Sequence, residues 1–211
     1  MRASHANVER MVQVETVGSG VILMHGVSWD TYQQLDTDRG DNKKWPRLAY
    51  LDGELEIMSP VGFAHELRKK MLARLLEMYA LERDIELNGF GNTTFADRAH
   101  ECGLEPDECY YIGECDPTKE PPHLAIEVSF TSGGVDKLEI YRRLGAREVW
   151  FWIHNQIDVY SLARNSYQKR LASKVLPDLD LADLSVRVAK ADFDKQTQAV
   201  RAYRESLRRA R

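Results

Sequence analysis

The sequence lacks several features that would identify its class directly. No run approaches the roughly 18 apolar residues that a membrane-spanning helix requires. The opening residues, MRASHANVER, contain no apolar core of a signal peptide, so we expect a cytoplasmic protein without a membrane partner. Neither a Gly-x-Gly-x-x-Gly motif nor a Walker loop is present, which disfavours nucleotide-dependent chemistry.

Cysteine and excess positive charge are also scarce. The three cysteines, Cys102, Cys109 and Cys115, form neither an even disulfide set nor the close Cys-x-x-Cys pair typical of zinc sites. We therefore expect reduced thiols. The formal net charge of −4 disfavours a general nucleic-acid coat protein, because such proteins are usually basic. A nuclease remains possible, since it needs only a local basic rim.

What is present is a mixture of helix and strand patterns in 211 residues, of which 43% are hydrophobic. The clearest helix covers residues 63–83, where apolar side chains form one stripe. Residues 138–145 predict a second helix that ends at Gly145. Strand patterns occupy residues 8–27, 48–58, 124–130, 148–153, 157–162 and 167–174, with hairpin turns expected at Asp52-Gly53 and Asn155-Gln156.

This order predicts an α/β (α+β) fold with a mixed sheet flanked by helices. We divide the chain into an N-terminal extension at residues 1–45, which contains a hairpin and a helix, and a core at residues 46–190. Residues 191–211 are polar and predict a helix or a tail.

One acidic residue stands in the middle of an apolar strand. Because side chains alternate along a strand, Leu124, Ile126, Val128 and Phe130 share one face, and Glu127 lies on the other. A carboxylate is costly to bury there unless a metal, a lysine or another donor compensates it. Small residues flank Glu127 on its face and leave space for a ligand.

A second carboxylate, Asp107, follows Pro106 at the end of a loop and precedes a predicted strand. If its strand lies beside the Glu127 strand, the two carboxylates repel one another, and a divalent cation relieves that repulsion. Oxygen ligands suit Mg²⁺ or Mn²⁺ better than zinc. Lys137 begins the next helix, from which its ammonium can reach back toward both carboxylates and assist phosphate chemistry.

These residues resemble the PD-(D/E)XK nuclease signature, and a longer stretch resembles the Uma-type restriction endonuclease family. The matching segments are LDGELEIMSP (51–60), a helix opening with His65, EPDECYYI (105–112), PPHLAIEVSFTS (121–132), DKLEIYRRLGAREVWFW (136–152) and IDVYSL (157–162). The resemblance implies a restriction-endonuclease-like fold and a DNA substrate. The general signature places a lysine two residues after the acid, where this chain has Ser129, and the resemblance implies that Lys137 replaces it.

Three more residues are candidates for supporting roles. Glu54 and Glu56 share a strand face, and either one lines the cleft or both face solvent. His65 either packs in the core or contacts a phosphate or a metal-bound water. Arg142, Arg143 and Arg147 are interpreted as a solvated helix face.

The sequence leaves three functions open. The first is a Mg²⁺- or Mn²⁺-dependent endonuclease in which Asp107 and Glu127 bind the metal and Lys137 assists. The second is a catalytically silent nucleic-acid-binding or regulatory module that kept the nuclease fold. The third is a metal-dependent hydrolase of a different substrate. A homodimer is compatible with the first, because two cuts need two sites.

Overall fold

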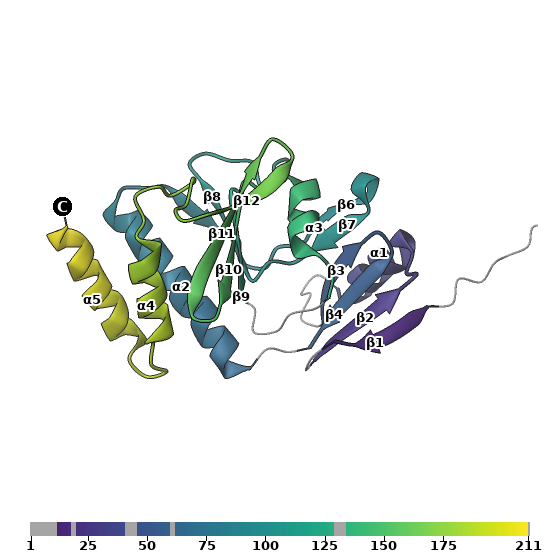
Figure 1. Cartoon of the computed structure of the whole chain (residues 1–211), viewed down its shortest axis with the longest axis horizontal. Coiled ribbons are helices and arrows are strands. Elements are labelled where there is room, and N and C mark those ends of the chain that lie inside the picture. Colours follow the sequence, from purple (N-terminus) through teal and green to yellow (C-terminus); the bar gives the residue numbers. More distant parts are fainter. Residues whose placement is uncertain (1–11, 18–19, 41–45, 60–61, 129–133, 211) are drawn as a thin grey trace, which may run out of the picture.

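The computed structural model describes residues 12–17, 20–40, 46–59, 62–128 and 134–210. In these residues the strands form two six-stranded sheets, one beside the other, with helices packed on them (Figure 1). The mixed α+β fold predicted from the sequence is confirmed. The strands differ from the prediction in being divided between two sheets instead of forming one.

The first sheet contains the N-terminal hairpin and has the strand order β1-β2-β4-β3-β7-β6, with all pairings antiparallel. Asp52 and Gly53 both have positive φ and form the predicted β3–β4 turn. Helix α1 (Trp29–Asp38), N-capped by Ser28, packs on this sheet. The strands are β1 (Gln13–Thr16), β2 (Val21–His25), β3 (Arg47–Leu51), β4 (Glu54–Met58), β6 (Phe95–Asp97) and β7 (Cys102–Leu104), and a 3-10 turn, η1 (Arg98–His100), joins the last two.

The second sheet has the strand order β12-β11-β10-β9-β8-β5. Strands β9 and β10 are parallel and are joined through α3 (Lys137–Leu144), whereas the other pairings are antiparallel. The turn between β10 and β11 lies at His154 and Asn155, one residue earlier than the sequence indicated. The strands are β5 (Leu87–Gly89), β8 (Glu108–Ile112), β9 (Leu124–Val128), β10 (Glu148–Ile153), β11 (Gln156–Ala163) and β12 (Ser166–Arg170).

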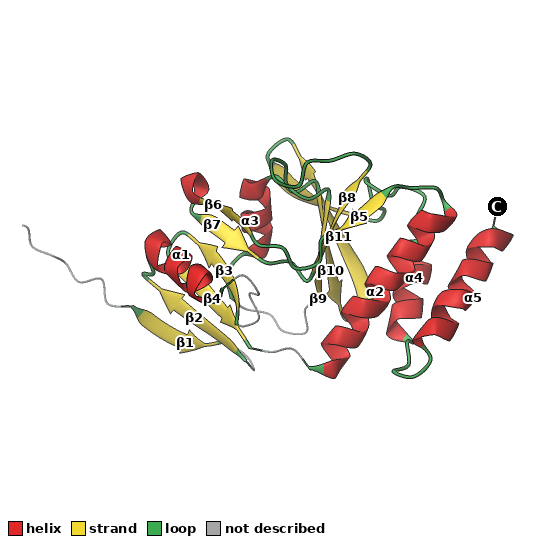
Figure 2. Ribbon diagram, turned by 180° about the vertical axis from the view of Figure 1, so that it is seen from behind, coloured by secondary structure: helices red, strands yellow, loops and turns green. Residues whose placement is uncertain are grey.

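Strand β9 separates two hydrophobic clusters. Leu124, Ile126 and Val128 pack in the cluster that includes three helices, whereas Ala125 belongs to the cluster shared with the first sheet. Figure 2 shows these helices together beyond the second sheet, namely α2 (Phe63–Glu82), α4 (Leu181–Ala189) and α5 (Gln196–Arg209). The predicted alternation is therefore confirmed for residues 124–128, while Ser129 and Phe130 lie outside the described residues. A register slip of one residue would push Glu127 into the apolar helical side, so the register is strongly specified.

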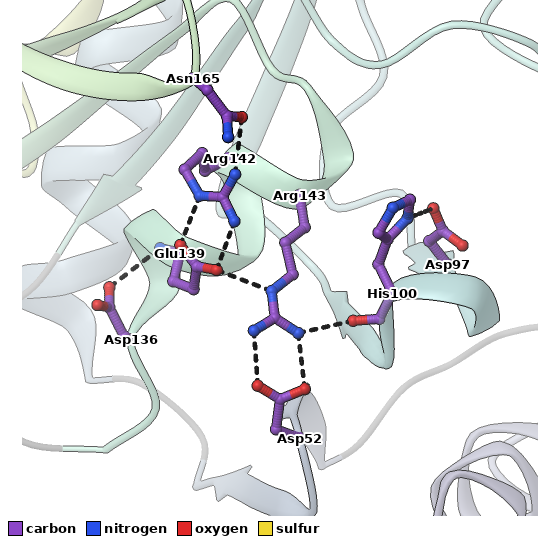
Figure 3. A network of polar contacts seen from close by, with 8 residues as sticks. All are labelled: Asp52, Asp97, His100, Asp136, Glu139, Arg142, Arg143 and Asn165. Carbon is purple, nitrogen blue, oxygen red and sulfur yellow. Dashed lines mark hydrogen bonds and ion pairs between the residues drawn. The ribbon is translucent and has the colours of Figure 1, made fainter.

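Helix α3 is tied to both sheets by charged side chains (Figure 3). Arg143 donates to both carboxylate oxygens of Asp52 at 2.6 Å, and Arg142 donates to Asn165 at 2.8 Å. Glu139 accepts from both arginines. Arg142 and Arg143 are thus held in ion pairs and do not form the freely solvated face that the sequence indicated. Single surface pairs contribute little stability, but together these contacts fix the orientation of the helix.

The C-terminal residues form α5, which packs along α2. Glu82, at the end of α2, accepts hydrogen bonds from Arg204 at 2.6 Å and from Arg208 at 2.8 Å. The domain boundaries at residues 45/46 and 190/191 stay predictions. No helix in the described ranges combines the length and the apolar character that crossing a bilayer demands.

We predict that Glu82→Gln lowers the Tm at pH 7 and that this difference from wild type narrows as the pH falls from 4.5 toward 2. Hydrogen bonds from Arg208 and Arg204 lower the pKa of Glu82 to about 2. The folded-state pKa of Glu82 is depressed, so its ionised carboxylate stabilises the folded protein fully above the unfolded-state pKa of about 4.3. This stabilisation is lost as the pH falls through the folded-state pKa. Thermal unfolding followed by circular dichroism between pH 7 and pH 3 measures it.

The exposed Glu205 on α5 provides the control. Glu205→Gln should leave the Tm close to that of wild type at each pH. A Glu82→Gln difference of the same size at pH 7 and pH 3 would contradict the prediction.

Candidate active site

The chain passes from the first sheet to the second at Asp107, which lies between β7 and β8 and is 3% exposed. Its backbone N–H donates to Ile126 O at 3.1 Å, and its carboxylate Oδ2 accepts from Val128 N at 2.7 Å. These two bonds hold Asp107 against β9 on either side of Glu127. The structure therefore brings the two predicted carboxylates to one place at the junction of the sheets.

Glu127 is 2% exposed, and helix α3 supplies hydrogen-bond donors to both of its oxygens. Lys137 Nζ donates to Oε2 at 2.9 Å, and Tyr141 Oη donates to Oε1 at 2.6 Å. Residues four apart lie on the same face of a helix, so a single helix orientation serves both bonds.

Lys137 is the first residue of α3, and the preceding Asp136 caps the helix by accepting from Glu139 N at 3.1 Å. The lysine reaches back over the carboxylates, as the sequence indicated. Burial alone would lower the pKa of Lys137, but the charges of Glu127, Glu56 and Asp107 outweigh it and raise the pKa above its ordinary value. Lys137 is therefore a cation at neutral pH and not a proton acceptor.

Two further side chains contact the carboxylate of Asp107. His65 Nε2, from the first turn of α2, lies 3.2 Å from Oδ2, and Arg47 Nη1, from the start of β3, lies 2.5 Å from Oδ1. Burial opposes ionisation of Asp107, but the hydrogen bond from His65 and the charge of Arg47 hold the pKa of this carboxyl well below its usual range. Asp107 is thus ionised at neutral pH.

Glu56 and Glu54 share a face of β4 but have different surroundings. Glu56 is 4% exposed and accepts a hydrogen bond from Val135 N at 3.0 Å. It lies close enough to Lys137 for its charge to raise the pKa of that lysine. Burial raises the pKa of Glu56 itself. Glu54 is about half exposed and lies 3.2 Å from His25, away from this cluster. Of the two candidates that the sequence left open, Glu56 is the one near Asp107 and Glu127.

Gly134 allows the segment before α3 to approach Glu56 closely. Its φ is +102°, and a Cβ added there would lie 1.9 Å from Glu56 Oε2. Because that carboxylate is buried and bonded to the N–H of Val135, it has little freedom to move aside. A residue without a side chain is therefore required at this position.

The sequence interpretation missed two members of the cluster, Arg47 and Tyr141. Tyr141 had a detectable signal, because it follows Lys137 by one helical turn. Arg47 had none, since it is distant from Asp107 in the sequence and reaches it only through the pairing of β3 with β7.

The donor atoms fit a hard divalent cation. Asp107 and Glu127 offer carboxylate oxygens, which Mg²⁺ and Mn²⁺ prefer, and each oxygen of an ionised carboxylate has two lone pairs. Among the described residues, no group of three or more His, Cys, Asp and Glu side chains is arranged to hold a metal ion. A cation at this place would therefore have only the two carboxylates as protein ligands and would keep several waters, as Mg²⁺ often does.

The chain matches the model of a known protein family. The family model Uma2, described as "Putative restriction endonuclease", matches residues 29–189, which is more than half of the chain. The matched range includes Arg47, Asp107, Glu127 and Lys137. No curated protein matches the sequence.

We predict that Gly134→Ala destabilises the fold more than an alanine placed at a similar backbone angle in open space. Gly113, with φ +76° and no atom within 4 Å of an added Cβ, is the matched position. Gly113→Ala should cost only the left-handed strain, about 1–2 kcal/mol. Gly134→Ala should cost about 1–3 kcal/mol more, because the Glu56 carboxylate must leave its partner. Urea unfolding measures both, and equal losses would contradict the steric role assigned to Gly134.

Proposed function

This chain belongs to the Uma2 family of putative restriction endonucleases, and from that membership we propose that it is a Mg²⁺- or Mn²⁺-dependent endonuclease that hydrolyses DNA phosphodiester bonds. The observation that carries the proposal is the burial of two ionisable carboxylates, Asp107 and Glu127, around the ammonium of Lys137. Structural ion pairs are often buried too. A cluster at the junction of two sheets, inside the range that the family model matches, favours catalysis over a purely structural role.

In this proposal Asp107 and Glu127 hold the metal. A bound Mg²⁺ or Mn²⁺ supplies Lewis-acid stabilisation of the charge that develops on the phosphate. Tyr141 keeps the Glu127 carboxylate in one orientation through its hydrogen bond to Oε1. His65 does the same for Asp107 at Oδ2. Both contacts prepare the two carboxylates before any ligand arrives, so that less reorganisation is needed in the reaction.

Lys137 assists as a cation. Because its pKa is raised, the ammonium keeps its protons and donates hydrogen bonds to the attacking water or to a non-bridging phosphate oxygen. In the overall reaction the water oxygen bonds to phosphorus, the ester P–O bond breaks, and the proton released by the water finally resides on the leaving oxygen. Lys137 stabilises the negative charge during this exchange and does not accept the proton.

DNA is the proposed substrate because the family is one of restriction endonucleases. Two lysines near the cluster are compatible with a phosphate backbone, although Lys69 is paired with Glu66. Lys69 and Lys70 lie on α2, and both act electrostatically on Glu108, the neighbour of Asp107. Lys70 is exposed to solvent, so it can contact a phosphate backbone without losing a buried partner. A cytoplasmic location and a homodimer stay predictions from the sequence.

A catalytically silent module that binds nucleic acid is the second candidate. The observation in its favour is that all four oxygens of Asp107 and Glu127 already have protein partners. This module predicts no cleavage at any metal concentration. The two candidates therefore separate in a single activity measurement.

We predict that the purified protein nicks or linearises plasmid DNA with Mn²⁺ and that Asp107→Asn, Glu127→Gln and Lys137→Met each reduce the rate by about a hundredfold or more, because each removes a charge at the reacting phosphate. Glu54→Gln, on the strand face of Glu56 but paired with His25, should retain the wild-type rate. Equal cleavage by all five proteins would indicate a contaminating nuclease, and no cleavage by wild type would favour the silent module.

A further inference from the structure

Two buried arginine–carboxylate pairs flank Pro106, and only one belongs to the candidate active site. Arg39 pairs with Glu105, which is 1% exposed, and Arg47 pairs with Asp107, which is 3% exposed. Both arginines come from the N-terminal part of the chain and neutralise a carboxylate of the same short connection between β7 and β8. Their chemistry is the same, but their partners differ in what else they contact.

We propose that Arg47 is an internal counter-ion that takes the place of the divalent cation at Asp107 in the metal-free protein. This inference rests on the proposed metal-dependent function. It assigns to Arg47 a regulatory effect on metal affinity: the positive guanidinium beside Oδ1 of Asp107 repels a metal bound there and must move away for tight binding. Arg47 is therefore a positioning residue that competes with the metal and does not itself act on the substrate.

The charges of the cluster support this competition. Arg47 and Lys137 are two cations that pair with the buried carboxylates of Asp107 and Glu127. A third buried carboxyl, Glu56, lies near Lys137, and burial raises its pKa. Repulsion between the incoming cation and two cations within a few ångströms is strong in a poorly solvated site. One of them must withdraw for a divalent cation to bind tightly.

Arg47 is better placed to withdraw than Lys137. Among the described residues, the guanidinium of Arg47 has a single hydrogen-bond acceptor, Oδ1 of Asp107, and no helix start fixes its position. Exposure does not separate the two cations, since 17% of the Arg47 side chain and 22% of the Lys137 side chain are exposed. Lys137 is fixed by its position at the capped start of α3 and by its bond to Glu127.

The pair of Arg39 and Glu105 provides the contrast. Arg39 also donates to Pro46 O and to Asp36, and Glu105 also accepts from Thr94. These partners belong to the first sheet and its connections. Glu105 has no contact with β9 among the hydrogen bonds of the described residues, and it acts on Arg47 only through its charge. Metal binding should therefore depend much less on Arg39 than on Arg47.

The test measures Mn²⁺ binding to wild type, Arg47→Met and Arg39→Met by isothermal titration, together with the Tm of each protein with and without Mn²⁺. Methionine keeps much of the aliphatic stem and removes the charge. Without metal, both variants should have a lower Tm than wild type, because each leaves a buried carboxylate without its cation. This decrease in Tm, common to both variants, measures the structural role of each arginine. The response to Mn²⁺ distinguishes the two variants.

We predict that Arg47→Met binds Mn²⁺ about tenfold tighter than wild type or more, whereas Arg39→Met changes the affinity by about twofold or less. A tenfold gain at saturating Mn²⁺ adds about 1.4 kcal/mol of stability, so Mn²⁺ should raise the Tm of Arg47→Met by about 3–5 °C more than that of wild type. A merely structural arginine would not increase metal affinity when it is removed.

Equal Mn²⁺ affinities in wild type and Arg47→Met would overturn the inference and leave the metal site intact. The absence of Mn²⁺ binding in every protein would overturn both the inference and the proposed metal-dependent function. If Arg47→Met does not fold without metal, Arg47→Lys replaces it. The single ammonium holds a carboxylate less firmly than a guanidinium, so a gain of about two- to threefold is expected, and no gain would overturn the inference.

Discussion

Burial of the Asp107 and Glu127 carboxylates at the junction of two sheets is the constraint on which the rest of the site depends. Removing an ionised carboxylate from water costs several kcal/mol in real proteins. This cost is comparable to the total stability of a marginally stable domain, so the loss of one partner can unfold it. The fold meets this cost with groups from separate elements. Arg47 comes from β3, His65 from α2 and Lys137 from α3, and each approaches a carboxylate directly. The negative charge that these partners neutralise is also what would attract a divalent cation.

The β9–α3–β10 unit shows how the local fold produces that arrangement. The parallel pairing of β9 with β10 requires a crossover, and α3 provides it. Asp136 sets where the helix begins, which places Lys137 and Tyr141 over the two oxygens of Glu127. Arg143 then holds the far end of the helix to Asp52 in the first sheet. The orientation of Lys137 therefore depends on contacts at both ends of α3.

The sequence could predict the parts of the site that depend on local rules. Strand alternation placed Glu127 opposite the apolar face, and the helix pattern from residue 138 placed Lys137 at the helix start. It could not divide the strands between two sheets, because local patterns contain no information on which strands pair. Arg47 was missed for that reason: it approaches Asp107 only because β3 pairs with β7, whose chain then continues into Asp107. Glu54 and Glu56 also could not be separated, since alternation gives both the same face.

Asp107, in the candidate active site, and its neighbour Glu105 differ in their place in the fold and not in their chemistry. Glu105 and Asp107 lie two residues apart, both are almost fully buried, and both face an arginine. Glu105 accepts from Arg39, at the end of α1, and from Thr94, just before β6, and these bonds indicate a structural role. Asp107 accepts a hydrogen bond from the N–H of Val128, the residue after Glu127. This bond holds the segment between β7 and β8 to the second sheet. The proposal places the chemistry at Asp107 because this contact brings a second buried carboxylate, Glu127, beside the first.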